Sequence, residues 1–327
     1  MARKGSIKYL HKAKSEKKDE FYTILSDIEK ELRHYKKHFK NKIVFCNCDD
    51  PRVSNFFHYF SYNFKQLGLK KLITTCYKSQ DMNSFSENKS KKGLGLEYTG
   101  DKNIIPDPEE IEIKYLDGDG DFRSEECIEL LKQADIVVTN PPFSLFREYV
   151  GQLMKYKKKF LIVGNWNAIS YQEIFKLIKE NKVWIGINSN RNFSGFVVPK
   201  NYPLLGTEAR IDENGNRIIS SNNTCWFTNL SIDKRNEELI LYKKYSKTDY
   251  PKYDNYDAIN VNVTKDIPSD YKGVIGVPIT FIDKYNPEQF EIIGKMATTK
   301  IDEFNKGYPY VNGKKIYARI LIKNKKI

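Results

Sequence analysis

The tetrapeptide Asn140-Pro141-Pro142-Phe143 carries the most specific chemical signal in the sequence. It follows an apolar run at 136–139, which predicts a buried strand. The side-chain oxygen of Asn140 and the main-chain carbonyl of Pro141 can both accept hydrogen bonds from an amino group. The two prolines restrict the backbone torsions and remove amide donors, so the segment presents its acceptors at low entropic cost.

Such acceptors suit an amino nitrogen attached to an aromatic ring, which is a poor nucleophile because its lone pair is delocalised. Two acceptors that hold both N–H groups draw this nitrogen toward a tetrahedral form, and no strong base is required. The ring of Phe143 offers a face on which a base can stack, a contact worth about 1–3 kcal/mol. The alternative is an ordinary turn, but the position directly after the strand favours the catalytic interpretation.

Asn47, Asp49 and Asp50 follow another apolar run, at 43–46. In the commonest order of an open nucleotide-binding sheet, the first and fourth strands are neighbours and ligands bind outside their carboxyl ends. That order places these three residues beside Asn140. Acidic side chains there can hold the ammonium or the ribose hydroxyls of S-adenosylmethionine. Asp50 can equally be the N-cap of the next helix.

Asp121 and Phe122 come after a third apolar run, at 111–116. The carboxylate can accept a hydrogen bond from the adenine amino group of the cofactor, with the ring packed beside it. The alternating Asp residues here also suggest a calcium loop, but the Gly and Glu that such a loop needs at positions six and twelve are missing. A plain Gly-Asp turn remains as the alternative. Trp166, after a further run at 160–163, either lines the pocket or belongs to the core.

Apolar runs alternate with helical patterns through the first half of the chain. Strands are expected at 43–46, 71–76, 111–116, 136–139 and 160–163. Helices are expected at 19–39, from Asp50 to a stop at Gly68, at 124–134, after the Asn-Pro-Pro-Phe segment with Tyr149 on the apolar face, and after a capping box formed by Ser170 and Glu173. This alternation predicts an α/β fold with a parallel, doubly wound, Rossmann-like sheet.

After about Trp184 the pattern changes to short strand-like pieces and turns, with hairpin signals at 212–215 and 312–313. In the last expected strand, Lys315, Tyr317, Arg319 and Lys323 share one face, and apolar residues occupy the other. The polar face can meet phosphates, or it can be a solvated edge that limits aggregation. The pattern alone slightly favours the solvated edge.

The composition favours a polyanionic partner and an intracellular location. Among 327 residues, 55 Lys and Arg face 42 Asp and Glu, a net charge of +13 that suits nucleic acid as well as it suits a generally basic surface. No apolar stretch is long enough for a membrane span, and the first 18 residues lack a signal core, so we expect a soluble cytoplasmic protein. Five cysteines without a regular framework indicate buried thiols in a reducing compartment, and no metal site is expected.

Taken together, segments spread over nearly the whole chain resemble the EcoRI-type adenine-specific DNA methyltransferases. They are KDEFYT (18–23), FCNCDDP (45–51), GDGDFRS (118–124), ADIVVTNPPFSLFREY (134–149), KKFLIVGN (158–165), YDAINV (256–261), GVPITFIDKYNPEQFEIIG (276–294) and YARILIK (317–323). The resemblance implies a class I methyltransferase that uses S-adenosylmethionine to methylate adenine N6 in a specific duplex site. It also implies a restriction-modification system, with a cognate endonuclease that need not contact the methylase.

By that resemblance, Phe21 and Tyr22 close over the methionine part of the cofactor. The cofactor loop matches Asn47, Asp49 and Asp50, the adenine-contacting segment matches Asp121 and Phe122, and the catalytic loop matches 140–143. Three regions follow: a basic leader with a cofactor-closing helix at 1–40, a catalytic core at 41–190, and a β-rich region at 191–327 that completes the sheet and recognises the DNA target. The rivals are methylation of guanine N2 in RNA or of a protein glutamine, and a non-catalytic DNA-binding relative.

Overall fold

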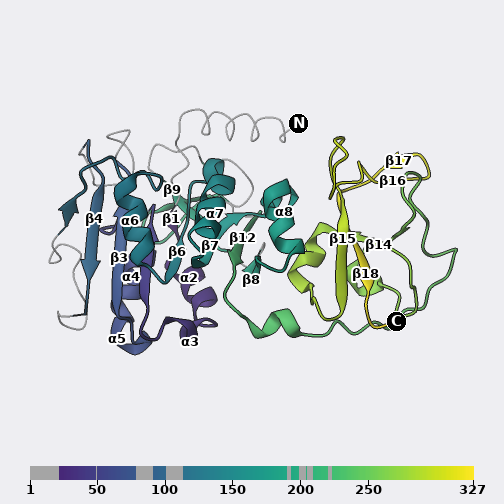
Figure 1. Ribbon diagram of the computed structural model, residues 1–327, viewed down its shortest axis with the longest axis horizontal. Helices are drawn as coiled ribbons and strands as arrows, with labels where there is room; N and C mark the ends of the chain where they lie inside the picture. The colour runs from purple at the N-terminus through teal and green to yellow at the C-terminus, as the bar shows by residue number, and fades with distance from the viewer. Residues whose placement is uncertain are drawn as a thin grey trace. The chain divides into compact units, whose positions relative to one another are not determined.

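The computed structural model describes residues 22–48, 50–78, 91–100, 113–189, 193–198, 204, 209–219 and 223–327. The chain forms two compact units (Figure 1). Unit 1 comprises Met1–Ala168 and Gly186–Leu230, and unit 2 comprises Ile169–Ile185 and Ser231–Ile327. Within the described ranges, no helix has both the length and the apolar character needed to cross a membrane.

An eight-stranded mixed sheet forms the centre of unit 1 (Figure 1). Its four inner strands are parallel to one another. Three of the outer strands each run antiparallel to the strand that precedes them from the centre of the sheet outward. In spatial order the strands are β5 (Lys114–Tyr115), β4 (Leu94–Tyr98), β3 (Lys71–Cys76), β2 (Ile43–Asn47), β6 (Ile136–Thr139), β7 (Lys159–Asn165), β12 (Thr224–Thr228) and β8 (Trp184–Ser189). The fold is therefore mixed α/β, built on a large mixed sheet.

Four of the five expected strands are confirmed as β2, β3, β6 and β7. The third prediction was wrong in its extent, because among the described residues only Lys114–Tyr115 is a strand, and it is a short edge strand. Residues 111 and 112 lie outside the described residues. The strand β4 was not predicted, because Gly95, its second residue, lowers its strand propensity. That glycine is required by close packing, since a Cβ there would lie 2.9 Å from a Leu116 side-chain carbon.

The first helix is shorter than predicted. Tyr22–Thr23 is a strand, β1, which pairs with β9 (Phe196–Val198), so the helical pattern begins only with α2 (Leu25–Leu32) and continues in α3 (Lys36–Phe39). Because the strand pairing supplies backbone hydrogen bonds at 22–23, it overrides the local helical periodicity. Residues 19–21 of the predicted helix lie outside the described residues.

Two helices begin later in the chain than predicted. Ser54, not Asp50, caps α4 (Asn55–Tyr62), and its hydroxyl accepts from the amides of Phe56 and Phe57 at 3.2 and 3.4 Å. Similarly, α8 (Gln172–Lys179) has Tyr171 as its N-cap, so it begins one residue later than a cap at Ser170 would place it. The stop at Gly68 is confirmed, because this residue ends α5 (Phe64–Leu67) in the left-handed conformation, with φ +64°.

A buried carboxylate fastens α2 to the end of β8. Glu31 is fully buried, and its oxygens accept hydrogen bonds from the amides of Ile187 at 2.8 Å and Asn188 at 2.7 Å, and from the Tyr35 hydroxyl at 2.7 Å. Burial raises the pKa of Glu31, while these donors act in the opposite direction. The helix that follows β1 is thus fixed to the main sheet by one acid.

Replacing Glu31 with Ala should lower the free energy of unfolding by about 3 kcal/mol, because several buried donors would lose their acceptor at once. Chemical denaturation monitored by circular dichroism measures the change. Glu29→Ala, on the exposed side of the same helix, is the matched control and should change stability by less than about 0.5 kcal/mol. If the two variants had equal free energies of unfolding, Glu31 would not be the residue that fixes α2 to β8.

Unit 2 contains a four-stranded sheet in the order β13 (Ile259–Asn260), β14 (Ile275–Pro278), β18 (Arg319–Asn324) and β15 (Phe290–Met296). A separate hairpin pairs β16 (Tyr310–Val311) with β17 (Lys314–Lys315). Both hairpin signals are confirmed, the other joining β10 (Arg210–Ile211) to β11 (Arg217–Ile219) in unit 1. The long last strand is wrong in its extent, because residues 316–318 separate β17 from β18.

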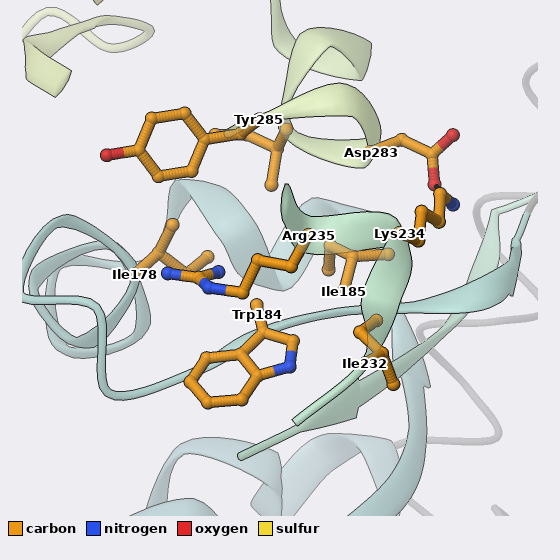
Figure 2. A pocket seen from close by; sticks show the side chains of 9 residues that line it. Ile178, Trp184, Ile185, Ile232, Lys234, Arg235, Asp283 and Tyr285 are labelled. Carbon is orange, nitrogen blue, oxygen red and sulfur yellow. Dashed lines mark hydrogen bonds and ion pairs between the residues drawn. The ribbon is translucent and has the colours of Figure 1, made fainter. Parts of the chain in front are cut away.

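An arginine between two aromatic rings holds part of unit 2 together (Figure 2). The guanidinium carbon of Arg235 lies 4.3 Å from the ring centroid of Trp184 and 5.9 Å from that of Tyr285. Beside it, Lys234 pairs with Asp283 at 2.7 Å. The cavity among these side chains measures about 10 Å³, room for roughly one water molecule. This cluster is therefore a packing feature rather than a ligand site.

Candidate active site

The carboxyl ends of β2 and β6 bring Asn47 and Asn140 together, as the strand order predicted. The two strands pair directly, with Val44 opposite Ile136, and the hydroxyl of Thr139 donates to the main-chain carbonyl of Asn47. Both asparagine side chains are largely buried, with 2% of Asn47 and 9% of Asn140 exposed. This hydrogen bond joins the last residue of β6, which precedes Asn140, to the last residue of β2.

Tyr149 connects this pair to the third polar segment. It lies on α7 (Phe146–Lys155), is fully buried, and donates its hydroxyl to Oδ1 of Asn47. Its ring meets the ring of Phe122 edge to face, with centroids 5.0 Å apart. On the same helix, Gln152 donates to the carbonyl of Phe122 at 3.0 Å. One helix, which directly follows the Asn-Pro-Pro-Phe loop, thus contacts both predicted cofactor segments.

From the sequence pattern, Tyr149 was expected only to pack on the apolar face of its helix. The available signal was its hydroxyl, because a buried tyrosine normally finds a hydrogen-bond partner. Trp166 is 5% exposed and begins a short 3-10 helix (Trp166–Ser170) after β7. Its burial fits the core alternative.

The segment with Asp121 is held at the carboxyl end of β3. The amide of Lys78, two residues beyond that strand, donates to the carbonyl of Asp119 at 2.7 Å, and Gly93 donates to Gly118 at 2.9 Å. Gly120 adopts φ +78° and packs so closely that an added Cβ would lie 2.3 Å from the carbonyl oxygen of Cys76. The loop that carries Asp121 therefore depends on a glycine at this position.

Of the three predicted cofactor carboxylates, the two that the structure describes, Asp50 and Asp121, are each paired with a nearby arginine. Asp121 accepts from the guanidinium of Arg123 at 2.8 and 2.6 Å, and this contact raises the pKa of Arg123. Asp50 is 1% exposed and accepts from Arg52 at 3.1 and 3.0 Å. The N-cap alternative for Asp50 is wrong, since Ser54 caps the helix.

Unit 1 also contains a four-stranded sheet in the order β1, β9, β11 and β10, and one of its aromatic residues contacts the Asn-Pro-Pro-Phe loop. The ring of Phe143 meets that of Phe196 in β9, with centroids 6.1 Å apart and planes at 74°. Tyr22 in β1 pairs with the same strand and is 8% exposed. The other two predicted cofactor residues, Phe21 and Asp49, lie outside the described residues.

The four predicted DNA-binding residues belong to unit 2 and do not share one exposed face. Lys315 and Lys323 are exposed, and Tyr317 is 87% exposed. Arg319 is only 6% exposed, which corrects its placement with the others. Its guanidinium donates to the side-chain oxygens of Asn260 and Asn262, each at 3.1 Å, and to the carbonyl of Tyr317 at 2.9 Å. Because these acceptors bind its guanidinium, Arg319 is buried rather than on the exposed face that strand alternation predicts.

A mixed sheet with polar loops at the carboxyl ends of neighbouring parallel strands is consistent with a methyltransferase fold. A family model described as the adenine-specific methyltransferase EcoRI matches residues 9–325. The chain belongs to this family, which confirms the resemblance drawn from its motifs.

Three curated relatives match over nearly their whole length. The type II methyltransferase M.EcoRI of Escherichia coli is 57% identical, and the match covers 100% of this chain and 99% of the relative. M.MgeORF184P of Mycoplasma genitalium is 41% identical, covering 98% and 99%. M.MpnI of Mycoplasma pneumoniae is 37% identical, covering 97% and 98%. No solved structure gives a significant match.

Proposed function

We propose that this protein methylates adenine N6 within a specific duplex DNA sequence, as the modification enzyme of a restriction-modification system. The observation that carries the proposal is the position of Asn140-Pro141-Pro142-Phe143, directly after β6 and beside the end of β2, in a chain of the adenine-specific methyltransferase family. A cognate endonuclease would recognise the same sequence. We place the enzyme in the cytoplasm, where its substrate DNA lies.

The fold supports a class I methyltransferase with a doubly wound, Rossmann-like core. In this proposal residues 1–40 contain the cofactor-closing segment, residues 41–190 the catalytic core and residues 191–327 the target-recognition region. The adjacency of β2 and β6 supports it, because ligands of open α/β sheets bind where the strand order reverses. The antiparallel β4 replaces the parallel strand that such a core usually has at this place.

The polar and aromatic groups at this edge fit S-adenosylmethionine, which supplies an activated methyl group when bound. Asn47 and Asp50 offer oxygens for its ammonium or ribose hydroxyls, and Asp121 with Phe122 offers a carboxylate and a ring for its adenine. Tyr22, from β1, would cover the methionine part together with Phe21. Asp49 belongs to the same proposed loop. Each carboxylate would bind its ligand while its neighbouring arginine balances the charge.

The catalytic loop acts on the target base through acceptors. Oδ1 of Asn140 and the carbonyl of Pro141 would accept the two N–H groups of the adenine amino group, making its lone pair available for attack. Pro142 fixes the turn, and Phe143 stacks on the base. Since the amino group is paired inside the duplex, the adenine has to rotate out of the helix to reach this loop. Lys315, Tyr317 and Lys323 would contact the DNA, while buried Arg319 positions the chain beneath Tyr317.

Replacing Tyr149 with Phe should weaken S-adenosylmethionine binding about tenfold, the cost of roughly one buried hydrogen bond. The hydroxyl that orients Asn47 would be lost, while the ring contact with Phe122 would remain. We expect kcat to change less than about threefold, because the catalytic loop keeps its acceptors. Calorimetric titration with the cofactor, together with steady-state kinetics, gives both quantities.

The matched control is Tyr156→Phe, the same change just after the end of α7, where the tyrosine is half-buried. This variant should bind the cofactor like the wild type. A Tyr149→Phe variant with unchanged cofactor affinity would show that the hydroxyl does not position the cofactor loop.

Expression in a host that lacks DNA methylation tests the proposed function. Sequencing of the recovered DNA for modified bases should reveal N6-methyladenine at one short recurrent sequence. Parallel incubations of purified protein with labelled S-adenosylmethionine and separate pools of DNA, RNA and protein distinguish DNA methylation from methylation of RNA or of a protein. Label confined to RNA or protein would reject the proposal, and DNA binding without methyl transfer would identify a non-catalytic relative.

A further inference from the structure

A short basic hairpin in unit 2 has the features of a DNA-reading element. Strands β16 and β17 pair through Tyr310 with Lys315 and Val311 with Lys314, and Asn312-Gly313 forms the two-residue turn (Figure 1). Both turn residues have positive φ, 49° and 73°, which is the geometry of a tight type I′ hairpin. The hairpin is therefore a defined structure rather than an irregular loop.

The hairpin is anchored at its turn and along one strand. The carboxylate of Asp254 accepts from the amide of Asn312 at 3.0 Å and from that of Gly313 at 2.7 Å. The amide of Asp254 in turn donates to the carbonyl of Tyr310 at 2.9 Å. The ammonium of Lys315 lies 3.1 Å from the ring centroid of Tyr308. These contacts limit the flexibility of the hairpin, which lowers the entropic cost of binding a partner.

The charge of this segment suits a polyanion. Residues 306–327 include seven Lys and Arg and no Asp or Glu. Of the nearby acids, Asp254 is engaged by the turn, and Asp257 pairs with Lys252 at 2.7 Å. Lys314 and Lys315 remain exposed. The cations of the hairpin are thus only partly offset by carboxylates.

Aromatic exposure separates this surface from a merely solvated edge. Tyr317 is 87% exposed just after β17, and Tyr310 is 38% exposed on the facing strand. A solvated edge needs only the lysines to prevent aggregation. Exposed tyrosines beside lysines instead combine apolar contact, hydrogen bonding and positive charge, a combination that suits bases and phosphates together.

We propose that the β16–β17 hairpin enters the major groove of duplex DNA. A two-stranded ribbon fits this groove, in which every base pair presents a distinct pattern of donors and acceptors. Lys314 and Lys315 contact phosphates at the rim, and Asn312 and Tyr317 face the base edges. The inference rests on the proposed function, because it assumes that the substrate is duplex DNA.

A double variant, Lys314→Gln with Lys315→Gln, tests the proposal in the full-length protein. Its matched control is Lys265→Gln with Lys272→Gln, which removes two exposed charges elsewhere in unit 2. Fluorescence anisotropy with a short duplex carrying the methylated sequence measures affinity over a range of salt concentrations. The hairpin variant should bind at least about tenfold more weakly, and the slope of log K against log salt should shrink by roughly 1.8, the value for two lost phosphate contacts.

Dimethyl sulfate protection identifies the groove, because guanine N7 lies in the major groove. Wild-type protein and the control variant should protect N7 within the site, and the hairpin variant should not. Cofactor binding and the thermal midpoint should match those of the control, which excludes a folding defect.

Equal affinity, salt slope and N7 protection in the two double variants would overturn the hairpin assignment while leaving the proposed function in place. Failure of the wild type to methylate any DNA would overturn the proposed function and the hairpin assignment together.

Discussion

Replacing Asn140 with Ala is expected to lower kcat for methyl transfer to DNA at least about 100-fold, by analogy with the loss of one preorganised hydrogen-bonding group at other catalytic centres. The substitution removes one of the two acceptors for the adenine amino group and leaves the nitrogen lone pair delocalised in the ring. Cofactor affinity should stay within about threefold, since Asn140 is not among the proposed cofactor ligands. Rapid-quench measurement of labelled methyl transfer gives the rate, and calorimetric titration gives the affinity.

Two companion variants give this experiment its controls. Ser144→Ala, an exposed position just beyond the loop, should keep normal turnover. Asn140→Asp keeps an oxygen acceptor at the same place and should recover part of the activity lost in the Ala variant. Near-normal turnover of Asn140→Ala would remove the catalytic role assigned to this loop.

Replacing Gly120 with Ala should weaken S-adenosylmethionine binding more than about tenfold and lower the free energy of unfolding by about 2–4 kcal/mol. Two penalties combine at this position. Its φ of +78° is unfavourable for a side chain, and a Cβ would lie 2.3 Å from the Cys76 carbonyl oxygen, a backbone atom that cannot move aside freely. The shift needed to relieve the contact would displace Asp121 and Phe122. Calorimetric titration and denaturant unfolding measure the two effects.

Gly118→Ala, two residues earlier in the same loop, is the matched control. An added Cβ there meets no atom within 4 Å, so the variant should behave like the wild type in both measurements. If the two alanine variants bound the cofactor equally well, the loop would not be under the steric constraint described, and Asp121 would lose its support as a cofactor ligand.

The sequence was sufficient to place the Asn-Pro-Pro-Phe loop beside the loop that follows β2. The runs that became β2 and β6 are continuous and apolar, as buried parallel strands require, and standard strand order then makes them neighbours. Once this adjacency is known, Asn47 and Asn140 have to meet. The antiparallel neighbour β4 could not be foreseen in the same way, because a glycine interrupts its pattern.

Contacts between residues distant in the chain explain the remaining differences between the predictions and the structure. Strand pairing of β1 with β9 overrides the helical periodicity around Tyr22. The local sequence cannot predict this pairing, because β9 is distant in the chain. The burial of Arg319 likewise depends on Asn260 and Asn262, which supply acceptors from another part of unit 2. Tyr149 was missed because its ring satisfies the pattern of an apolar helix face, which conceals the role of its hydroxyl.

The chemical identity of the methylated nucleoside tests the central claim most directly. Duplex DNA incubated with purified protein and methyl-labelled S-adenosylmethionine can be hydrolysed to nucleosides and separated by chromatography. We predict label only in N6-methyladenine with the wild type, and none above background with Asn140→Ala. Label in a methylated cytosine, or undiminished labelling by the variant, would contradict the assignment of this loop to the adenine amino group.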